Sequence, residues 1–149
     1  MPKELVMLDT NVLVYAFYQD AAQHPAAFRI LDQAQNEDAF LCVTPQVLAE
    51  FYSVITNPRR VSSPFTPQEA LQEVHNIRTL PGMTVLPVPV DVVDRWTDLV
   101  RRHPVTGRKI FDVQLVATML GNGVKKIYTF NVTDFEPFAD IEVLVPEAP

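Results

Sequence analysis

Three acidic residues occupy positions at which the surrounding sequence is apolar. Asp9 lies in VMLDTN, Glu50 in VLAEFY and Asp112 in KIFDVQ, whereas an acid such as Glu69 lies in a polar stretch. A fourth acid, Asp134, follows the apolar stretch KKIYTF. An ionised carboxylate in apolar surroundings loses several kcal/mol of solvation. Such acids therefore need a cation or a set of hydrogen-bond donors.

A cluster of these four acids would bind a divalent cation. Two like charges about 4 Å apart repel each other by ~4 kcal/mol at an effective dielectric constant near 20, and a cation between them removes that repulsion. No Cys or His stands directly beside any of the four acids. Oxygen ligands without sulfur or imidazole favour Mg²⁺ or Mn²⁺ over zinc. The alternative is that each acid pairs with its own Arg or Lys, or caps a helix.

Short apolar stretches predict strands, and longer stretches with helical periodicity alternate with them. The strands are predicted at residues 5–8, 39–43, 83–88, 125–130 and 141–146, and the helices at 11–18, 24–37, 44–58, 66–82, 90–103 and 109–123. A loop with a helical turn separates the last two strands. This alternation implies right-handed crossovers and a mostly parallel sheet with helices on both faces, an α/β fold.

Several helix ends are marked by residues that suit them. Thr44 can cap a helix whose first turn holds Pro45, and Thr66 and Glu69 have the spacing of a capping box. Two helices show an apolar face. The residues that we expect to be buried on these faces are Phe28, Ile30, Leu31 and Ala34 in one helix, and Val92, Val93, Trp96, Leu99 and Val100 in the other.

The predicted elements bring the four acids towards one edge of the sheet. Asp9 and Asp134 follow strands, and ligands of an open parallel sheet bind beyond the carboxyl ends of its strands. Asp112 lies near the start of a helix, where the helix dipole favours negative charge. Glu50 lies in the second turn of the helix that begins near Thr44. We therefore expect these acids to form one site.

Composition indicates one globular domain over residues 1–149, with 48% apolar and 20% charged residues. No apolar run reaches the ~20 residues that cross a bilayer, and no signal-peptide layout is present, so we expect a cytoplasmic protein. The net charge of −6 argues against bulk positive potential for nucleic acid. Cys42 is alone and predicted to be buried, and His24, His75 and His103 are predicted at helix ends or within a polar helix.

The sequence resembles the PIN-domain family, and within it the VapC-type toxin nucleases. The matching pieces occur in order: LDTNVLVYAF at the start, PQVLAEFYSVIT, IFDVQLVATM, and TFNVTDFEPF near the end. The resemblance implies a three-layer α/β/α sandwich and a Mg²⁺- or Mn²⁺-dependent endoribonuclease. It also implies that Asp9, Glu50, Asp112 and Asp134 are the catalytic and metal-binding acids. The family often has an acid at the position of Asn131.

Three polar residues would support this acidic site. Asn11 is expected to orient Asp9 or the backbone by hydrogen bonds, or else to cap the first helix. Thr129 and Asn131 are polar support near Asp134. RNA would be bound by cations outside the pocket, for which the candidates are Arg59, Arg60, Arg108 and Lys109.

The family resemblance further implies a homodimer and a small cognate antitoxin protein as partners. An apolar face around Phe51, Tyr52 and Ile55 is a candidate contact surface. A catalytically silent PIN-like module that binds RNA or protein is the main alternative function, although a lost active site has no reason to keep four costly charges. An aspartyl phosphatase is disfavoured because Asn11 stands where that chemistry needs a second acid, and a receiver domain lacks its early acidic pair.

Overall fold

The computed structural model describes residues 3–149. Its centre is a five-stranded sheet with the order β3-β2-β1-β4-β5, in which every neighbouring pair is parallel. The predicted strands are confirmed, although each is shorter than expected. Their bounds are β1 (Val6–Leu8), β2 (Leu41–Val43), β3 (Met83–Val85), β4 (Lys126–Tyr128) and β5 (Glu142–Leu144).

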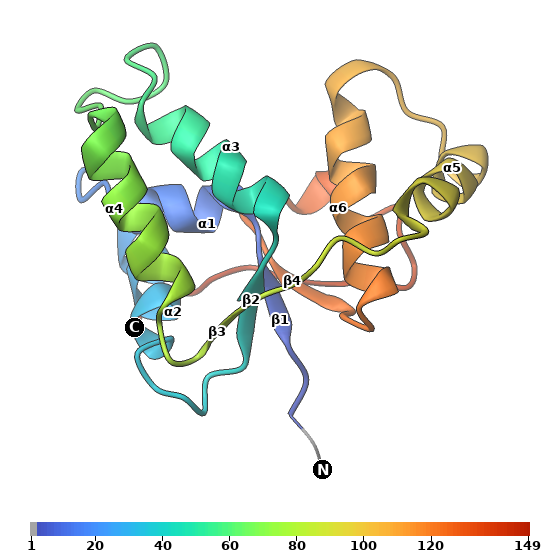
Figure 1. Cartoon of the computed structure of the whole chain (residues 1–149), viewed down its shortest axis with the longest axis horizontal. Coiled ribbons are helices and arrows are strands. Elements are labelled where there is room, and N and C mark those ends of the chain that lie inside the picture. Colours follow the sequence, from blue (N-terminus) through green and yellow to red (C-terminus); the bar gives the residue numbers. More distant parts are fainter. Residues whose placement is uncertain (1–2) are drawn as a thin grey trace.

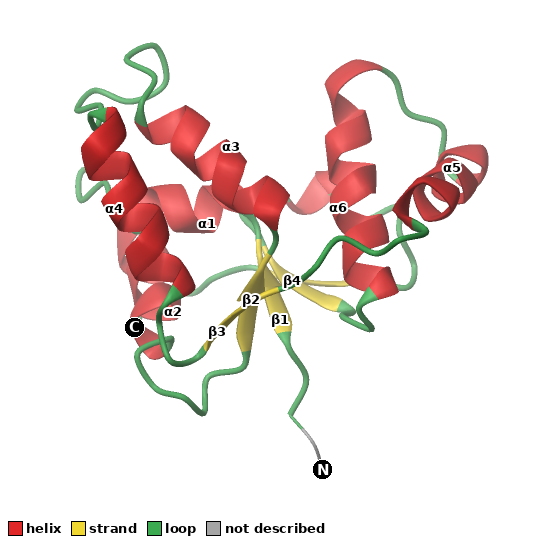
Figure 2. Cartoon of the chain, viewed as in Figure 1, coloured by secondary structure: helices red, strands yellow, loops and turns green. Residues whose placement is uncertain are grey.

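The predicted helices are confirmed as well, and they cover both faces of the sheet. In Figures 1 and 2, α1 to α4 lie on one side of the sheet and α5 and α6 on the other, which is the expected three-layer α/β/α arrangement. No helix within residues 3–149 is both long and apolar enough to span a membrane. The helices are α1 (Thr10–Tyr15), α2 (His24–Gln33), α3 (Pro45–Ile55), α4 (Pro67–Arg78), α5 (Val92–Arg102) and α6 (Ile110–Gly121), with 3₁₀ turns η1 (Gly107–Lys109) and η2 (Val132–Asp134).

Some residues assigned to buried helix faces are exposed. Phe28 on α2 is 51% exposed and packs beside His24 at the surface, and Val93 on α5 is 55% exposed. In α5 only Leu99 is fully buried, while Val92, Trp96 and Val100 are partly covered. The reason is that α5 is an outer helix that packs mainly on α6, so a narrower stripe of its surface is covered.

The expected apolar contact surface on α3 is also wrong. Phe51 and Ile55 are fully buried, because α3 packs against α1 on one side and α4 on the other. Phe51 further contacts Phe17, with the ring centroids 5.4 Å apart. Only Tyr52 keeps part of its surface exposed. These residues stabilise the core and offer no continuous face to a partner.

Local capping interactions set where α3 and α4 begin. Thr44 is 1% exposed, and its hydroxyl accepts a hydrogen bond from the backbone N–H of Val47 at 3.1 Å. Thr66 and Glu69 form the predicted capping box at α4. Because α3 carries Glu50, the Thr44 cap helps to define where that carboxylate lies.

The Thr44 cap gives a testable contribution to stability. Thr44→Ala is expected to lower the free energy of unfolding by about 1 to 2 kcal/mol, since the Val47 N–H then lacks its acceptor. For a domain of this size that corresponds to a fall in Tm of roughly 2 to 8 °C. Urea and thermal unfolding would measure it. Thr44→Ser keeps the oxygen and should retain most of the stability, so an equal loss in both variants would assign the effect to the methyl group.

Candidate active site

The strand order reverses direction beside β1, and the polar residues gather at this point. The chain proceeds from β1 outward to β2 and β3, and then returns to place β4 on the other side of β1. In open α/β sheets the ligand crevice lies at such a switch point, beyond the carboxyl ends of the strands. Asp9 follows β1 and Thr129 follows β4, and the Asp9 N–H donates to the Tyr128 carbonyl at 3.0 Å.

Asp9 is almost buried, with 8% exposure, and three donors hold its carboxylate. The Thr129 hydroxyl donates to Oδ2 at 2.7 Å, the Asn11 amide donates to Oδ2 at 3.1 Å, and the Thr10 N–H donates to Oδ1 at 2.8 Å. Burial raises the pKa of Asp9 despite the hydrogen bonds from Thr129 and Thr10, and the charges of Glu50 and Asp134 raise it further. The ionised form is therefore costly without a cation.

Asn11 joins this network and orients Asp9, which is one of the two roles expected for it. Its amide nitrogen donates to Asp9 and to the Thr129 hydroxyl, and its Oδ1 accepts from the Phe130 N–H at 3.1 Å. The residue that caps α1 is Asp9, so the alternative that Asn11 caps this helix is wrong. Asn131 contributes through its backbone N–H, which donates to Thr129 at 3.0 Å, and it also lines the pocket.

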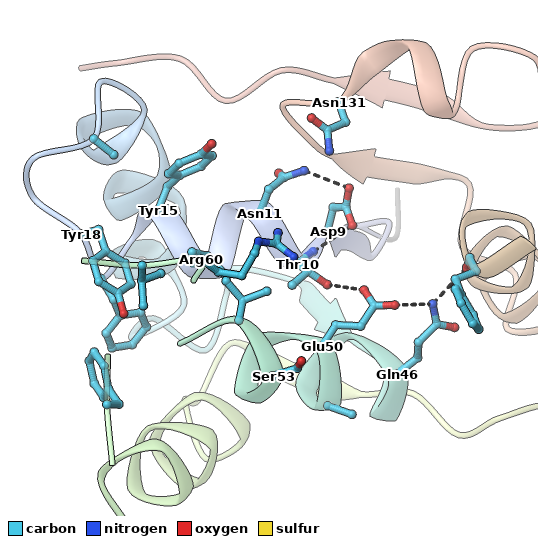
Figure 3. A pocket seen from close by; sticks show the side chains of 18 of the residues that line it. Asp9, Thr10, Asn11, Tyr15, Tyr18, Gln46, Glu50, Ser53, Arg60 and Asn131 are labelled. Atoms are coloured by element: carbon cyan, nitrogen blue, oxygen red, sulfur yellow. Dashed lines mark hydrogen bonds between the residues drawn. The ribbon is translucent and has the colours of Figure 1, made fainter. Parts of the chain in front are cut away.

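Glu50 faces Asp9 from α3, and both of its oxygens accept hydrogen bonds (Figure 3). The Thr10 hydroxyl donates to Oε2 at 2.9 Å, and the Gln46 amide donates to Oε1 at 3.0 Å. Sequence reasoning missed both donors. Gln46 could have been found from its spacing, because it stands four residues before Glu50 on the same helix. Thr10 stands directly after Asp9, but nothing local indicated that it reaches α3.

Asp112 lies in the first turn of α6 and lines the same pocket. Burial raises its pKa to about 7, with further contributions from the charges of Asp134, Asp9 and Glu50, while Lys109 acts in the opposite direction. Asp134, in η2, is close enough to affect Asp9 and Asp112 electrostatically. It is not among the residues that line the pocket, whereas Asn131 is.

A cavity of about 1290 Å³ is lined by Asp9, Glu50 and Asp112. Two of the four candidate RNA-binding cations, Arg60 and Arg108, line it, while Arg59 and Lys109 are exposed outside it. Four aromatic residues, Tyr15, Phe17, Tyr18 and Phe65, also line the cavity. The cavity is therefore lined by carboxylates, two cations and aromatic rings.

The chemistry of these carboxylates fits a hard divalent cation. Within the described residues, none of the four carboxylates forms an ion pair with Lys or Arg. The alternative that each acid has its own cationic partner is therefore wrong for residues 3–149. The alternative that an acid caps a helix holds for Asp9. Over residues 3–149 no three acidic, His or Cys side chains stand close enough to form a ready-made metal cluster. Three of the acids, Asp9, Glu50 and Asp112, line one cavity, and Asp134 lies outside its lining.

The histidines and the cysteine lie apart from this chemistry. His24 Nδ1 is 2.8 Å from the Tyr15 carbonyl, and His103 ends α5 with its ring packed against Phe138. Neither these two nor His75 lines the cavity. Burial raises the pKa of Cys42 to about 12, which keeps its thiol protonated and unreactive.

The fold and the site together define an α/β/α protein with a carboxylate-lined cavity at the switch point of its sheet. The PIN domain family model matches residues 6–140, and the chain belongs to the PIN-domain family. The chain is 28% identical to ribonuclease VapC24 of Mycobacterium tuberculosis over 142 residues, which cover 95% of this chain and 97% of that protein.

Solved structures share the fold. The crystal structure of Mycobacterium tuberculosis VapC20, a sarcin-ricin loop cleaving toxin, superposes with a TM-score of 0.68 at 19% identity over 97% of this chain and 99% of that one. A toxin-antitoxin complex from Klebsiella pneumoniae gives a TM-score of 0.60 at 15% identity, over 97% of this chain and 99% of the other.

Proposed function

We propose that the protein is a metal-dependent endoribonuclease that hydrolyses RNA phosphodiester bonds, and that it is the toxin of a toxin–antitoxin pair. The observation that carries the proposal is that Asp9, Glu50 and Asp112 line one cavity, with Asp134 close enough to act on Asp9 and Asp112 electrostatically. None of the four carboxylates forms an ion pair with Lys or Arg among the described residues. PIN-domain membership and the relative named as a ribonuclease support it.

In this proposal each acid has a defined role. Asp9 and Asp112 would be the main ligands of Mg²⁺ or Mn²⁺, and Asp134 would complete the site directly or through water. Glu50 would hold a second ion or orient the attacking water. Asn11, Thr129 and Asn131 would support the site, since they form the hydrogen-bond network that holds the Asp9 carboxylate.

Hydrolysis requires that a water oxygen forms a bond to phosphorus while the bond to the leaving oxygen breaks. A bound divalent ion supplies positive charge to the phosphoryl oxygens and lowers the pKa of a bound water. Among the described residues that line the cavity there is no His, Lys or Cys to activate a side-chain nucleophile. Glu50, whose two oxygens accept hydrogen bonds from Thr10 and Gln46, would accept a further hydrogen bond from the attacking water.

The direct test is RNA cleavage by the purified, partner-free protein. A mixture of structured and single-stranded RNAs would be incubated with Mg²⁺, Mn²⁺ or EDTA. We expect cleavage with either metal and none with EDTA. Mn²⁺ binding without cleavage of any RNA would instead favour a catalytically silent binding module.

Arg60 lines the cavity together with Asp9 and Glu50, as Arg108 also does, so it would hold a phosphate of the substrate (Figure 3). Arg60→Gln is expected to raise KM for RNA about tenfold and to reduce the salt dependence of binding by about one phosphate contact. Arg59→Gln is the matched control, since Arg59 is adjacent, exposed and outside the cavity. Steady-state cleavage at several salt concentrations would measure both, and equal effects in the two variants would assign them to general surface charge.

The partners and the organisation of the chain complete the proposal. A cognate antitoxin is supported by the toxin-antitoxin complex among the structural neighbours, and a homodimer by the family resemblance. Residues 1–149 are proposed to form one PIN domain, as one sheet and one core in the described part suggest. The expected cytoplasmic location stays a prediction.

A further inference from the structure

Gln46 connects two helices that carry proposed metal ligands. It stands in the first turn of α3, and its Nε2 donates to Glu50 Oε1 at 3.0 Å and to the Phe111 carbonyl at 3.0 Å (Figure 3). Phe111 directly precedes Asp112 in the first turn of α6. One amide group therefore joins the Glu50 carboxylate to the backbone that carries Asp112.

This hydrogen bond joins helices from the two sides of the sheet, between which there are few other contacts. Helix α3 belongs to the helices on one side of the sheet and α6 to those on the other (Figure 1). Among residues 3–149, the bond from Gln46 to Phe111 is the one hydrogen bond that joins α3 to α6. At the cavity, this side chain therefore supplies the hydrogen bond between the two helices.

The surroundings determine which way the Gln46 amide points. Its NH₂ faces two acceptors, a carboxylate and a carbonyl, so a rotated amide would place its oxygen against both of them. In the observed orientation Gln46 Oε1 is buried and accepts no hydrogen bond from the described residues. Leaving a buried acceptor unmatched costs free energy, and the two bonds from the NH₂ group outweigh that cost here.

The other carboxylate oxygen of Glu50 is also held by a hydrogen bond. Thr10, at the start of α1, donates to Oε2, so Glu50 is held between α1 and the Gln46 amide that reaches α6. Both donors are neutral. The carboxylate is therefore oriented towards the cavity while its negative charge stays available to a cation.

We propose that Gln46 is a positioning residue that sets where Glu50 lies relative to Asp112, and that it thereby determines the affinity of the site for its divalent ion. The inference rests on the proposed function. Groups that orient metal ligands typically contribute about 10- to 100-fold to metal affinity or activity.

The test compares Gln46→Met with Gln114→Met. Methionine retains the length of glutamine but cannot donate a hydrogen bond. Gln114 lines the same cavity from α6, and no hydrogen bond of its side chain occurs within residues 3–149, so it is a matched control. Mn²⁺ would be titrated calorimetrically into each protein without RNA. We expect Mn²⁺ affinity to fall about tenfold in Gln46→Met and to change less than about twofold in Gln114→Met.

Two further measurements separate positioning from a general structural role. In Gln46→Met, kcat for RNA cleavage should fall while KM changes less than about twofold, because the RNA-binding cations are untouched. In a Glu50→Gln background, Gln46→Met should cause no additional loss of Mn²⁺ affinity, since its effect passes through Glu50. Gln46→Asn retains an amide but is shorter, and it should weaken Mn²⁺ binding as Gln46→Met does.

Each other result overturns the inference. Unchanged Mn²⁺ affinity in Gln46→Met and Gln46→Asn, equal losses in the Gln46 and Gln114 variants, or additive losses with Glu50→Gln would show that Gln46 does not position Glu50. If the unmodified protein cleaves RNA with metal in any of these cases, the proposed function stands without this inference. If the unmodified protein neither binds Mn²⁺ nor cleaves RNA, both fail.

Discussion

Replacement of Asp112 by asparagine is expected to lower metal-dependent RNA cleavage by about 100-fold or more in kcat/KM, since even indirect supports of metal ligands contribute 10- to 100-fold. Asparagine has nearly the same shape but no charge. Asp112 lies in the first turn of α6, where its carboxyl is half-buried and its pKa is raised to about 7 by burial and then by the neighbouring acids. Loss of this carboxylate removes a proposed direct ligand.

Cleavage would be followed under single-turnover conditions with Mn²⁺ and with EDTA. Asp94→Asn is the matched control, because Asp94 also lies in the first turn of a helix, α5, but is exposed and outside the cavity. It should leave cleavage within about twofold, as expected for a surface substitution remote from the site. Full activity of Asp112→Asn would exclude this residue as a metal ligand and would direct attention to Asp9 and Glu50.

The second large effect concerns stability and its dependence on pH. The pKa of Asp112 is about 7 in the folded protein against an ordinary value of 3.8. Between these values the folded chain keeps a proton that the unfolded chain releases, so the free energy of unfolding falls as pH rises. Below pH ~4 both states are protonated and the penalty vanishes, whereas above pH ~7 it is complete.

The expected change in the free energy of unfolding is obtained by reducing the full cost of burial in two steps. A shift of this size on a fully buried group would cost about 4 kcal/mol, and partial exposure of Asp112 reduces this to about 2 kcal/mol through solvent screening. Asparagine also gives up roughly 0.3 to 1 kcal/mol of attraction to the N-terminus of α6. Asp112→Asn should therefore stabilise the metal-free protein at pH 8 by about 1 kcal/mol, or roughly 2 to 4 °C in Tm.

With metal bound, the unmodified protein should become more stable than Asp112→Asn. At a free Mn²⁺ concentration of about 100 times Kd, binding stabilises the unmodified chain by ~2.7 kcal/mol, which is roughly 5 to 10 °C in Tm. Asp112→Asn should show little of this rise. Melting curves between pH 4 and pH 8 in EDTA, repeated with Mn²⁺ at pH 7, would measure both effects. A Tm that does not respond to millimolar Mn²⁺ would contradict the idea that the acids share a cation.

The elements were largely predictable because their signals are local. The Thr44 cap and the capping box of Thr66 and Glu69 involve residues three apart, and the alternation of strands and helices restricts the topology to a parallel sheet. The predicted burial of Phe28 and Val93 was wrong. Helical periodicity predicts which face of a helix is apolar, but it does not predict how much of that face a neighbouring helix covers. That depends on which helices pack on the outside.

The sequence by itself predicted that the four carboxylates form one site, because ionised acids in or beside apolar stretches need a cation or hydrogen-bond donors. Only the tertiary structure decided which neutral donors hold Asp9 and Glu50. Thr10 and Glu50 are 40 residues apart, Gln46 and Phe111 are 65 apart, and Asp9 and Thr129 are 120 apart. These contacts exist because the sheet order places β4 beside β1 and brings α3 and α6 to the same edge. A hydrogen bond requires atoms within about 3 Å, and no local pattern specifies distances across separate elements.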